Sequence, residues 1–138
     1  MKPVILDTNI LLDIFIFEDA RASELKNALL NQEIKAYSSK TTLEELADVI
    51  SRPLFSVDSK KQVEIVQQWQ ALSQWIDEPN LEVAPWKCKD LDDQVFLNIA
   101  FTLRPSILIS KDKEVLKLAS QAVKEGILIT ANYNTFSF

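Results

Sequence analysis

Three short runs of the sequence consist entirely of apolar residues, and they limit the chain to a few fold classes. They are residues 4–6, 107–109 and 127–129. A strand with one solvent-facing side alternates apolar and polar residues, whereas a strand buried on both faces is apolar throughout. The three runs therefore predict a parallel sheet that is covered on both faces.

Segments with the periodicity of amphipathic helices separate these strands. Apolar residues recur at spacings of three and four, as in Leu25, Ala28 and Leu29. We expect helices at residues 19–32, 41–50, 59–77, 91–103 and 113–124, and weaker strands at 34–37 and 81–83. Thr41 and Glu44 have the spacing of a capping box at the start of the second helix, and Gly126 is expected to end the last one.

The alternation of strands and helices predicts the α/β class. The expected architecture is a doubly wound three-layer α/β/α sandwich with a mostly parallel central sheet of about five strands. A chain of 138 residues has the length of one domain, so we expect residues 1–138 to form a single domain.

Three residue types are rare in this chain, and their rarity excludes several kinds of active site. There is no histidine, one cysteine (Cys88) and one glycine (Gly126). A serine–histidine–aspartate triad, a cysteine-rich metal site and glycine-rich phosphate loops are therefore excluded. Any enzymatic chemistry must come from carboxylates, hydroxyls, amides and lysines, and carboxylates are the ligands that Mg²⁺ and Mn²⁺ prefer.

The N-terminal region predicts a cytoplasmic location. The apolar run that begins at Val4 stops at Asp7, so it lacks the pattern of a signal peptide. The apolar stretch at residues 10–17 contains Asp13 and is shorter than the about 20 residues that span a bilayer. We therefore expect no association with a membrane.

Carboxylates follow the expected strands at the points where each strand ends. Asp7 directly follows residues 4–6, and Asp112 follows residues 107–109. Further acids follow the two weaker strands, namely Glu44, Glu45, Asp90, Asp92 and Asp93. Adjacent strands lie about 4.8 Å apart, so these groups are expected to converge at one edge of the sheet. Two such charges about 5 Å apart repel by roughly 3 kcal/mol at an effective dielectric of 20, which favours a bound cation or a raised pKa.

A structural role would also explain several of these acids. Acidic residues are common at helix N-termini, where they accept hydrogen bonds from free amides and complement the helix dipole. Asp90, Asp92 and Asp112 each have the position of such a cap. Asp7 is harder to explain in this way, because a carboxylate next to a buried strand loses part of its hydration.

Four motifs together resemble the PIN domain family. They are Asp7-Thr8-Asn9 after an apolar strand, Leu43-Glu44-Glu45-Leu46, residues 88–100 and residues 108–116, and they occur in the family's order over essentially the whole chain. Residues 44–55 look most similar to the bacterial branch of the family that comprises toxin components of toxin–antitoxin systems.

The resemblance implies roles for individual residues. The catalytic acids would be Asp7, Glu45, Asp93 and Asp112, and the metal ligands would be Asp7, Asp93, Asp112 and, as an additional ligand, Asp90. Supporting roles would fall to Asn9, Ser110, Glu44 and Glu114. Glu45 is preferred to Glu44 as the second acid because it directly precedes the apolar Leu46. Glu114 stands where many relatives carry aspartate, so its direct ligation is in doubt.

The activity that the resemblance implies is that of an endoribonuclease that hydrolyses RNA phosphodiester bonds with Mg²⁺ or Mn²⁺ as cofactor. The chain would then be the toxin of a toxin–antitoxin pair, with an antitoxin protein as a possible partner. The alternative is a catalytically silent PIN-like module that binds RNA or protein. The apolar stretch at 10–17 and the helix at 59–77 offer more apolar surface than a small domain easily buries, which favours a homodimer or an antitoxin groove.

The charge of the chain bears on how it would bind RNA. The net charge is -5, whereas nucleic-acid-binding proteins are usually basic. The four catalytic acids account for most of this excess, and several lysines lie next to the acidic motifs in sequence. We expect phosphate contacts from Lys40, Lys89, Lys111 and Lys113.

Overall fold

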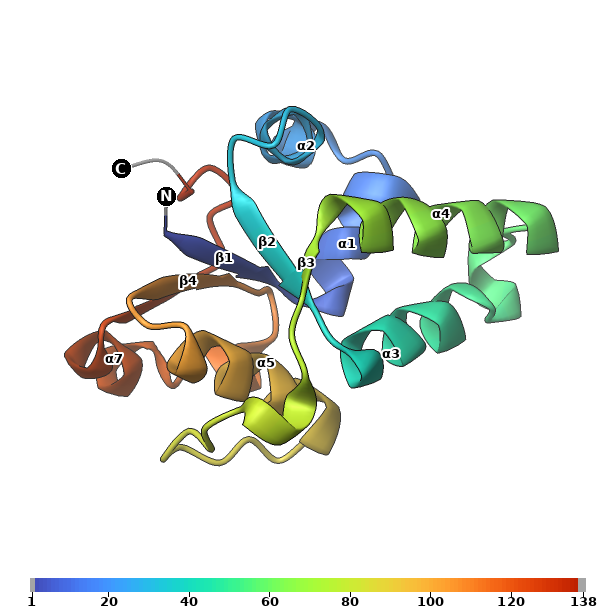
Figure 1. Cartoon of the computed structure of the whole chain (residues 1–138). Coiled ribbons are helices and arrows are strands. Elements are labelled where there is room, and N and C mark those ends of the chain that lie inside the picture. Colours follow the sequence, from blue (N-terminus) through green and yellow to red (C-terminus); the bar gives the residue numbers. More distant parts are fainter. Residues whose placement is uncertain (1, 137–138) are drawn as a thin grey trace.

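A five-stranded sheet in which every adjacent pair of strands is parallel forms the centre of the molecule (Figure 1). The computed structural model describes residues 2–136. In sheet order the strands are β3 (Gln74–Trp75), β2 (Lys35–Ser38), β1 (Pro3–Leu6), β4 (Ser106–Ile109) and β5 (Ile127–Thr130). The predicted α/β/α sandwich with a mostly parallel sheet is confirmed.

Helices cover both faces of the sheet. The described part of the chain contains α1 (Thr8–Phe15), α2 (Ser23–Leu30), α3 (Lys40–Ile50), α4 (Ser59–Leu72), α5 (Leu91–Thr102), α6 (Lys113–Leu116) and α7 (Ala119–Ala122). In Figure 1, α1, α2 and α4 lie on one side of the sheet, and α5 and α7 lie on the other. Alternate residues of β1 supply the two cores, because Val4 and Leu6 face the first group of helices whereas Ile5 faces the second.

The two central strands determine where a site can form. The chain runs from β1 outward to β2 and β3, and it returns to the other side of β1 to form β4 and β5. The direction of strand order therefore reverses between β1 and β4, and ligands of doubly wound folds bind at the carboxyl ends of strands at such a point. Leu6 pairs with Ile109, so the next residues along the two strands, Asp7 and Ser110, lie side by side.

Two predictions for the segments around β3 are wrong, namely the end of one helix and the presence of one strand. The helix expected at 59–77 ends at Leu72, and the following residues form the short edge strand. The strand expected at 81–83 is irregular instead, because side chains of α5 bind its backbone. The amide of Glu82 donates to the Thr102 hydroxyl (2.8 Å), and the amide of Ala84 donates to the Asn98 side chain (2.9 Å).

The ends of other helices also differ from the prediction. The helix expected at 19–32 is a short 3-10 helix (Ala20–Ala22) followed by α2. The helix expected at 113–124 is divided into α6, α7 and a 3-10 helix (Val123–Glu125), because the amide of Leu118 bonds to Val115, three residues back. Gly126 ends it as predicted, with a φ of 84° that favours glycine.

The N-cap of α3 lies two residues earlier than expected. Ser39, not Thr41, is the N-cap, and Ser39 and Thr42 exchange the two hydrogen bonds of a capping box. Thr41 instead donates its amide and hydroxyl hydrogens to the carboxylate of Glu78, which lies in the 3-10 helix Glu78–Asn80. Thr41 therefore binds Glu78, a residue distant in sequence, instead of capping the helix with Glu44.

The apolar stretch at residues 10–17 is mostly α1, and it is buried. Ile10, Leu11 and Ile14 are among the fully buried side chains of the core, whereas Phe17 is exposed. The idea that this stretch leaves apolar surface for a partner is therefore wrong for residues 10–15. No helix among residues 2–136 has the length and hydropathy that crossing a bilayer requires.

Candidate active site at the carboxyl ends of β1 and β4

Six carboxyl side chains line one hollow of about 270 Å³ at the reversal point of the sheet. They come from four parts of the chain that are distant in sequence. They are Asp7, Glu45, Asp90, Asp92, Asp93 and Asp112. The fold therefore brings together the acids that follow separate strands, as the strand pattern predicted.

Asp7 joins the end of β1 to the start of α1. Its side chain is almost completely buried, and one carboxylate oxygen accepts a hydrogen bond from the amide of Ile10 (3.2 Å). The other oxygen accepts a hydrogen bond from the Ser110 hydroxyl. Burial raises the pKa of Asp7 to about 6, although these hydrogen bonds oppose the increase.

Ser110 connects Asp7 to Asp112. Its hydroxyl donates to Asp7 and accepts a hydrogen bond from the amide of Asp112 (3.1 Å). Asp112 in turn caps α6, because its carboxylate accepts from the amide of Glu114 (2.8 Å). The buried serine thus fixes the acid after β4 relative to the acid after β1.

Glu45 reaches the hollow from the middle of α3. Val49 and Arg52 line the same hollow, four and seven residues further along, so one side of this helix and its C-terminal end face the site. The Glu45 Oε2 atom is buried and has no hydrogen-bond partner among the described residues. Burial and the neighbouring charge of Asp92 raise the pKa of Glu45 to about 7, and the nearby Thr8 hydroxyl, which forms no hydrogen bond of normal geometry with Oε2, opposes the increase only in part. Glu44 is exposed and does not line the hollow.

The third group of acids lies at the start of α5. Asp90 is the N-cap of this helix and accepts a hydrogen bond from the amide of Asp92 (2.9 Å). Burial and the adjacent carboxyl of Asp112 raise the pKa of Asp93 well above its ordinary value. The carboxyl groups of Asp93 and Asp112 therefore lie close enough to interact electrostatically.

Helix capping accounts for part of this acidic set. Asp90 and Asp112 cap helices as the structural alternative predicted, and Asp7 also caps α1. Capping does not explain Glu45, which lies in the interior of α3. A buried carboxylate oxygen without a partner is costly, so Glu45 indicates that the hollow has a role beyond helix capping.

The remaining predicted site residues differ in their relation to the hollow. Asn9 lines it, whereas Glu114 forms an ion pair with Lys117, the C-cap of α6, and is outside the lining. None of the four lysines expected to contact phosphate lines it, and Lys111 is instead paired with Asp13 (2.6 Å). The basic side chain among the lining residues is Arg52, which sequence reasoning missed. Arg52 lies beyond the end of α3 with an extended backbone, so helical spacing from Glu45 does not predict its position.

The segment that contains these acids matches a known protein family. A family model described as "PIN domain" matches residues 3–114, which is most of the chain and includes all six acids of the hollow. The chain belongs to the PIN domain family. The resemblance on which the sequence prediction rested is thus confirmed, and it extends from β1 to α6.

A solved structure supports the same PIN fold. It is described as the "crystal structure of VapBC2 from Rickettsia felis bound to a DNA fragment from their promoter". The similarity has a TM-score of 0.57 at 14% sequence identity and covers 93% of this chain and 98% of the other chain. No curated protein sequence matches this PIN domain.

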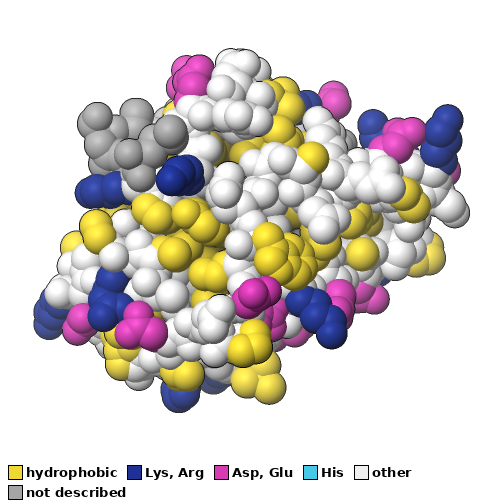
Figure 2. Space-filling view, viewed as in Figure 1, with side chains coloured by type: hydrophobic (Ala, Val, Ile, Leu, Met, Phe, Trp, Pro, Cys, Tyr) yellow, Lys and Arg dark blue, Asp and Glu magenta, His cyan; other side chains and the backbone are white. Residues whose placement is uncertain are grey.

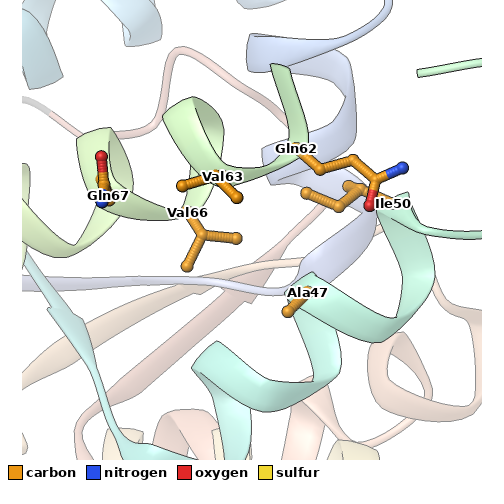
Figure 3. A pocket seen from close by; sticks show the side chains of 6 residues that line it. All are labelled: Ala47, Ile50, Gln62, Val63, Val66 and Gln67. Carbon is orange, nitrogen blue, oxygen red and sulfur yellow. The ribbon is translucent and has the colours of Figure 1, made fainter. Parts of the chain in front are cut away.

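The other side of α3 faces a second, apolar hollow in this PIN domain. Ala47 and Ile50 of α3 and Gln62, Val63, Val66 and Gln67 of α4 line a space of about 360 Å³. Figure 3 shows Ala47 on α3 facing Val66 on α4 across this space. Its lining contains no titratable side chain. Of these two hollows, only the carboxylate hollow can therefore support acid–base chemistry.

The donors of the carboxylate hollow fit a hard divalent cation in their chemistry. Their oxygens are the ligands that Mg²⁺ and Mn²⁺ prefer, and Glu45 offers a buried oxygen with no other partner. Within residues 2–136 there is no group of three or more acidic or cysteine side chains arranged to hold a metal ion. Mg²⁺ usually keeps several water ligands and binds through one or two carboxylates, so a three-carboxylate cage is not required.

Proposed function

We propose that this PIN domain is an endoribonuclease that hydrolyses RNA phosphodiester bonds with Mg²⁺ or Mn²⁺ held at the carboxylate hollow. Membership of the PIN family supports a nuclease activity. The observation that carries the proposal is Glu45, whose buried oxygen has no partner and whose pKa is raised to about 7 in a hollow lined by five aspartates. A structural carboxylate would be paired.

The proposed roles follow from the surroundings of each acid. Asp7, Asp93 and Asp112 would hold the cation, either directly or through its water ligands, with Asp90 as an additional ligand, and Ser110 and Asn9 would orient them. The cation would supply an acidified water and offset charge on the attacked phosphate. Glu45 would accept a proton from the attacking water, because a group whose pKa is about 7 exchanges protons readily at neutral pH.

We also propose that the chain is the toxin of a toxin–antitoxin pair. The resemblance of residues 44–55 to that branch of the family supports this role, as does the similar fold of a VapBC2 component. An antitoxin protein would then be a partner, and a homodimer remains a proposal that exposed side chains such as Val63 and Trp75 favour.

The neighbouring residues Glu44 and Glu45 provide a matched test of this function. Glu45→Gln should lower the rate of cleavage of single-stranded RNA in Mn²⁺ by about 10²-fold or more, because it removes the proton acceptor. Glu44→Gln removes the same charge from an exposed position and should leave the rate unchanged. Production of the wild type in bacteria should slow growth, and Glu45→Gln should relieve this effect.

Two outcomes would contradict the proposal. Equal rates for the two variants would remove Glu45 from the chemistry. If the wild type binds RNA and cleaves none with either metal, the catalytically silent module is the correct description.

A further inference from the structure

The carboxylate hollow has a second wall of different chemistry. This second wall is the part of the lining formed by Leu12, Val49, Arg52 and Phe55. Arg52 is the one cationic side chain in this lining. RNA is a polyanion, and the six carboxyl groups would repel it unless a local cation bound its backbone.

The local sequence explains why Arg52 and Phe55 lie together at this wall. The helix α3 ends at Ile50, and Arg52 has the extended backbone that a residue before proline favours (φ -69°, ψ 136°). Pro53 begins a 3-10 helix (Pro53–Phe55), which ends at Ser56 in the left-handed region (φ 52°). This tight turn directs the chain back, so that Phe55 joins the lining close to Arg52.

The guanidinium of Arg52 is available to a ligand. Its partner is Asp48, four residues earlier on α3, at 3.2 Å, and both side chains are more than half exposed (59% and 71%). Exposed pairs of this kind contribute little to stability, so a phosphate can replace the carboxylate at small cost. Arginine binds phosphate oxygens through two parallel hydrogen bonds, which makes it well suited to that exchange.

The aromatic part of this wall offers a surface for a base. The Phe55 ring is partly exposed and contacts the exposed ring of Phe17, with 5.9 Å between centroids. Aromatic rings bind single strands by stacking on bases, whereas the bases of a duplex are already stacked. On the face shown in Figure 2, basic side chains are dispersed among acidic ones, with no continuous basic surface for a duplex.

We infer that Arg52 and Phe55 form a binding wall for single-stranded RNA. The Arg52 guanidinium binds a backbone phosphate beside the carboxylates, and the Phe55 ring stacks on an unpaired base. This inference rests on the proposed RNA substrate and names two residues that would bind it.

The test measures, by fluorescence polarisation at several salt concentrations, how tightly the protein binds a short, labelled, single-stranded RNA of mixed sequence. Titrations are made in EDTA and in Ca²⁺, which takes the same oxygen ligands as Mg²⁺. Arg52→Gln should weaken binding and reduce the slope of log affinity against log salt by about 0.7, the value for one lost phosphate contact on a single strand. Lys124→Gln, an exposed substitution of equal charge far from the lining, should leave this slope unchanged.

The second variant separates stacking from charge. Phe55→Leu should weaken binding of the single strand by about tenfold and should not change the affinity for the same RNA annealed to its complement. A thermal melt of each variant checks that it is folded.

Three outcomes would overturn the inference. They are an unchanged salt slope in Arg52→Gln, an equal loss of single-strand and duplex affinity in Phe55→Leu, and no binding of the single strand by the wild type in either condition. If the wild type binds the RNA but never cleaves it in Mn²⁺, the proposed nuclease activity fails, whereas the assignment of Arg52 is still decided by the slope.

Discussion

Two aspartates of the α1 region are buried to nearly the same extent but have opposite surroundings. Asp7 is 3% exposed and Asp13 is 4% exposed. Asp7 accepts hydrogen bonds from a hydroxyl and an amide and has other carboxyls as neighbours. Asp13 accepts from the ammonium of Lys111 (2.6 Å) and from the hydroxyl of Tyr133. Equal burial therefore conceals a difference in charge, because a cationic side chain binds Asp13 whereas the carboxyl of Asp112 is a charged neighbour of Asp7.

The Asp13 cluster has the properties of a structural ion pair. Burial lowers the pKa of Lys111, but the carboxylate of Asp13 more than compensates and raises it overall. The cluster joins α1 to the loop after β4 and to the segment after β5, three parts of the chain that are distant in sequence. Opposite charges attract within this cluster, whereas the like charges of the carboxylate hollow repel one another.

The largest expected difference in stability is between a variant that lacks the carboxylate of Asp13 and one that lacks the carboxylate of Asp7. In EDTA at pH 8, Asp13→Asn should lower the free energy of unfolding by about 3 kcal/mol, because it leaves Lys111 without its counter-charge. Asp7→Asn should leave that free energy unchanged or increase it, because it relieves repulsion among the acids. Urea denaturation measures both. A loss in Asp7→Asn as large as that in Asp13→Asn would show that the two aspartates have the same structural role.

The pH dependence of stability sharpens the comparison. Folding raises the pKa of Asp7 to about 6 and that of Glu45 to about 7, so the folded state binds these protons more tightly than the unfolded state. Their contribution to stability is complete below the unfolded pKa values, near 4, and is lost as the pH rises through about 7. Asp7 alone contributes roughly 3 kcal/mol to this change. The metal-free protein should therefore become less stable between pH 4 and 7.

Variants assign this slope to the hollow. Asp7→Asn should flatten the dependence measured by urea denaturation in EDTA, whereas the exposed Glu44→Gln should retain it. Stability that increases over the same range in the wild type would contradict the raised pKa values.

Binding of a metal ion should change the stability of the folded protein by a smaller amount. Mn²⁺ at a concentration 100 times its Kd should stabilise the wild type by about 2.7 kcal/mol, and it should raise Tm more at pH 8 than at pH 6 because the ligands must lose protons. Asp7→Asn and Asp93→Asn should abolish this increase, whereas Glu44→Gln should show it in full. A thermal melt with and without Mn²⁺ measures the shift. An increase that persists in both aspartate variants would place the cation elsewhere.

The sequence predicted best what depends on neighbouring residues. The apolar runs at β1, β4 and β5 gave the parallel sheet, and the position of Asp7 directly after β1 placed it at the correct edge. The preference for Glu45 over Glu44 agrees with their positions, since only Glu45 of the two lines the hollow. These features follow from strand burial and helix periodicity, which are local.

The features that the sequence did not reveal depend on partners distant in the chain. The side chains of Asn98 and Thr102 bind the backbone near residue 83 and prevent a strand there. Lys111 was expected to contact phosphate because of its neighbours in sequence, but its partner Asp13 is 98 residues away. Only the folded chain shows that the cation beside the acids is Arg52.

The position of β5 at one edge of the sheet has a practical consequence. The PIN match ends at residue 114, so a fragment cut there would contain every acid of the hollow but not β5. The four residues of β4, all buried in the intact molecule, would then form an open edge with unpaired amides and apolar side chains. Open edges of this kind pair with other chains, so the fragment should aggregate when it is expressed, even though it retains the complete acidic motif set.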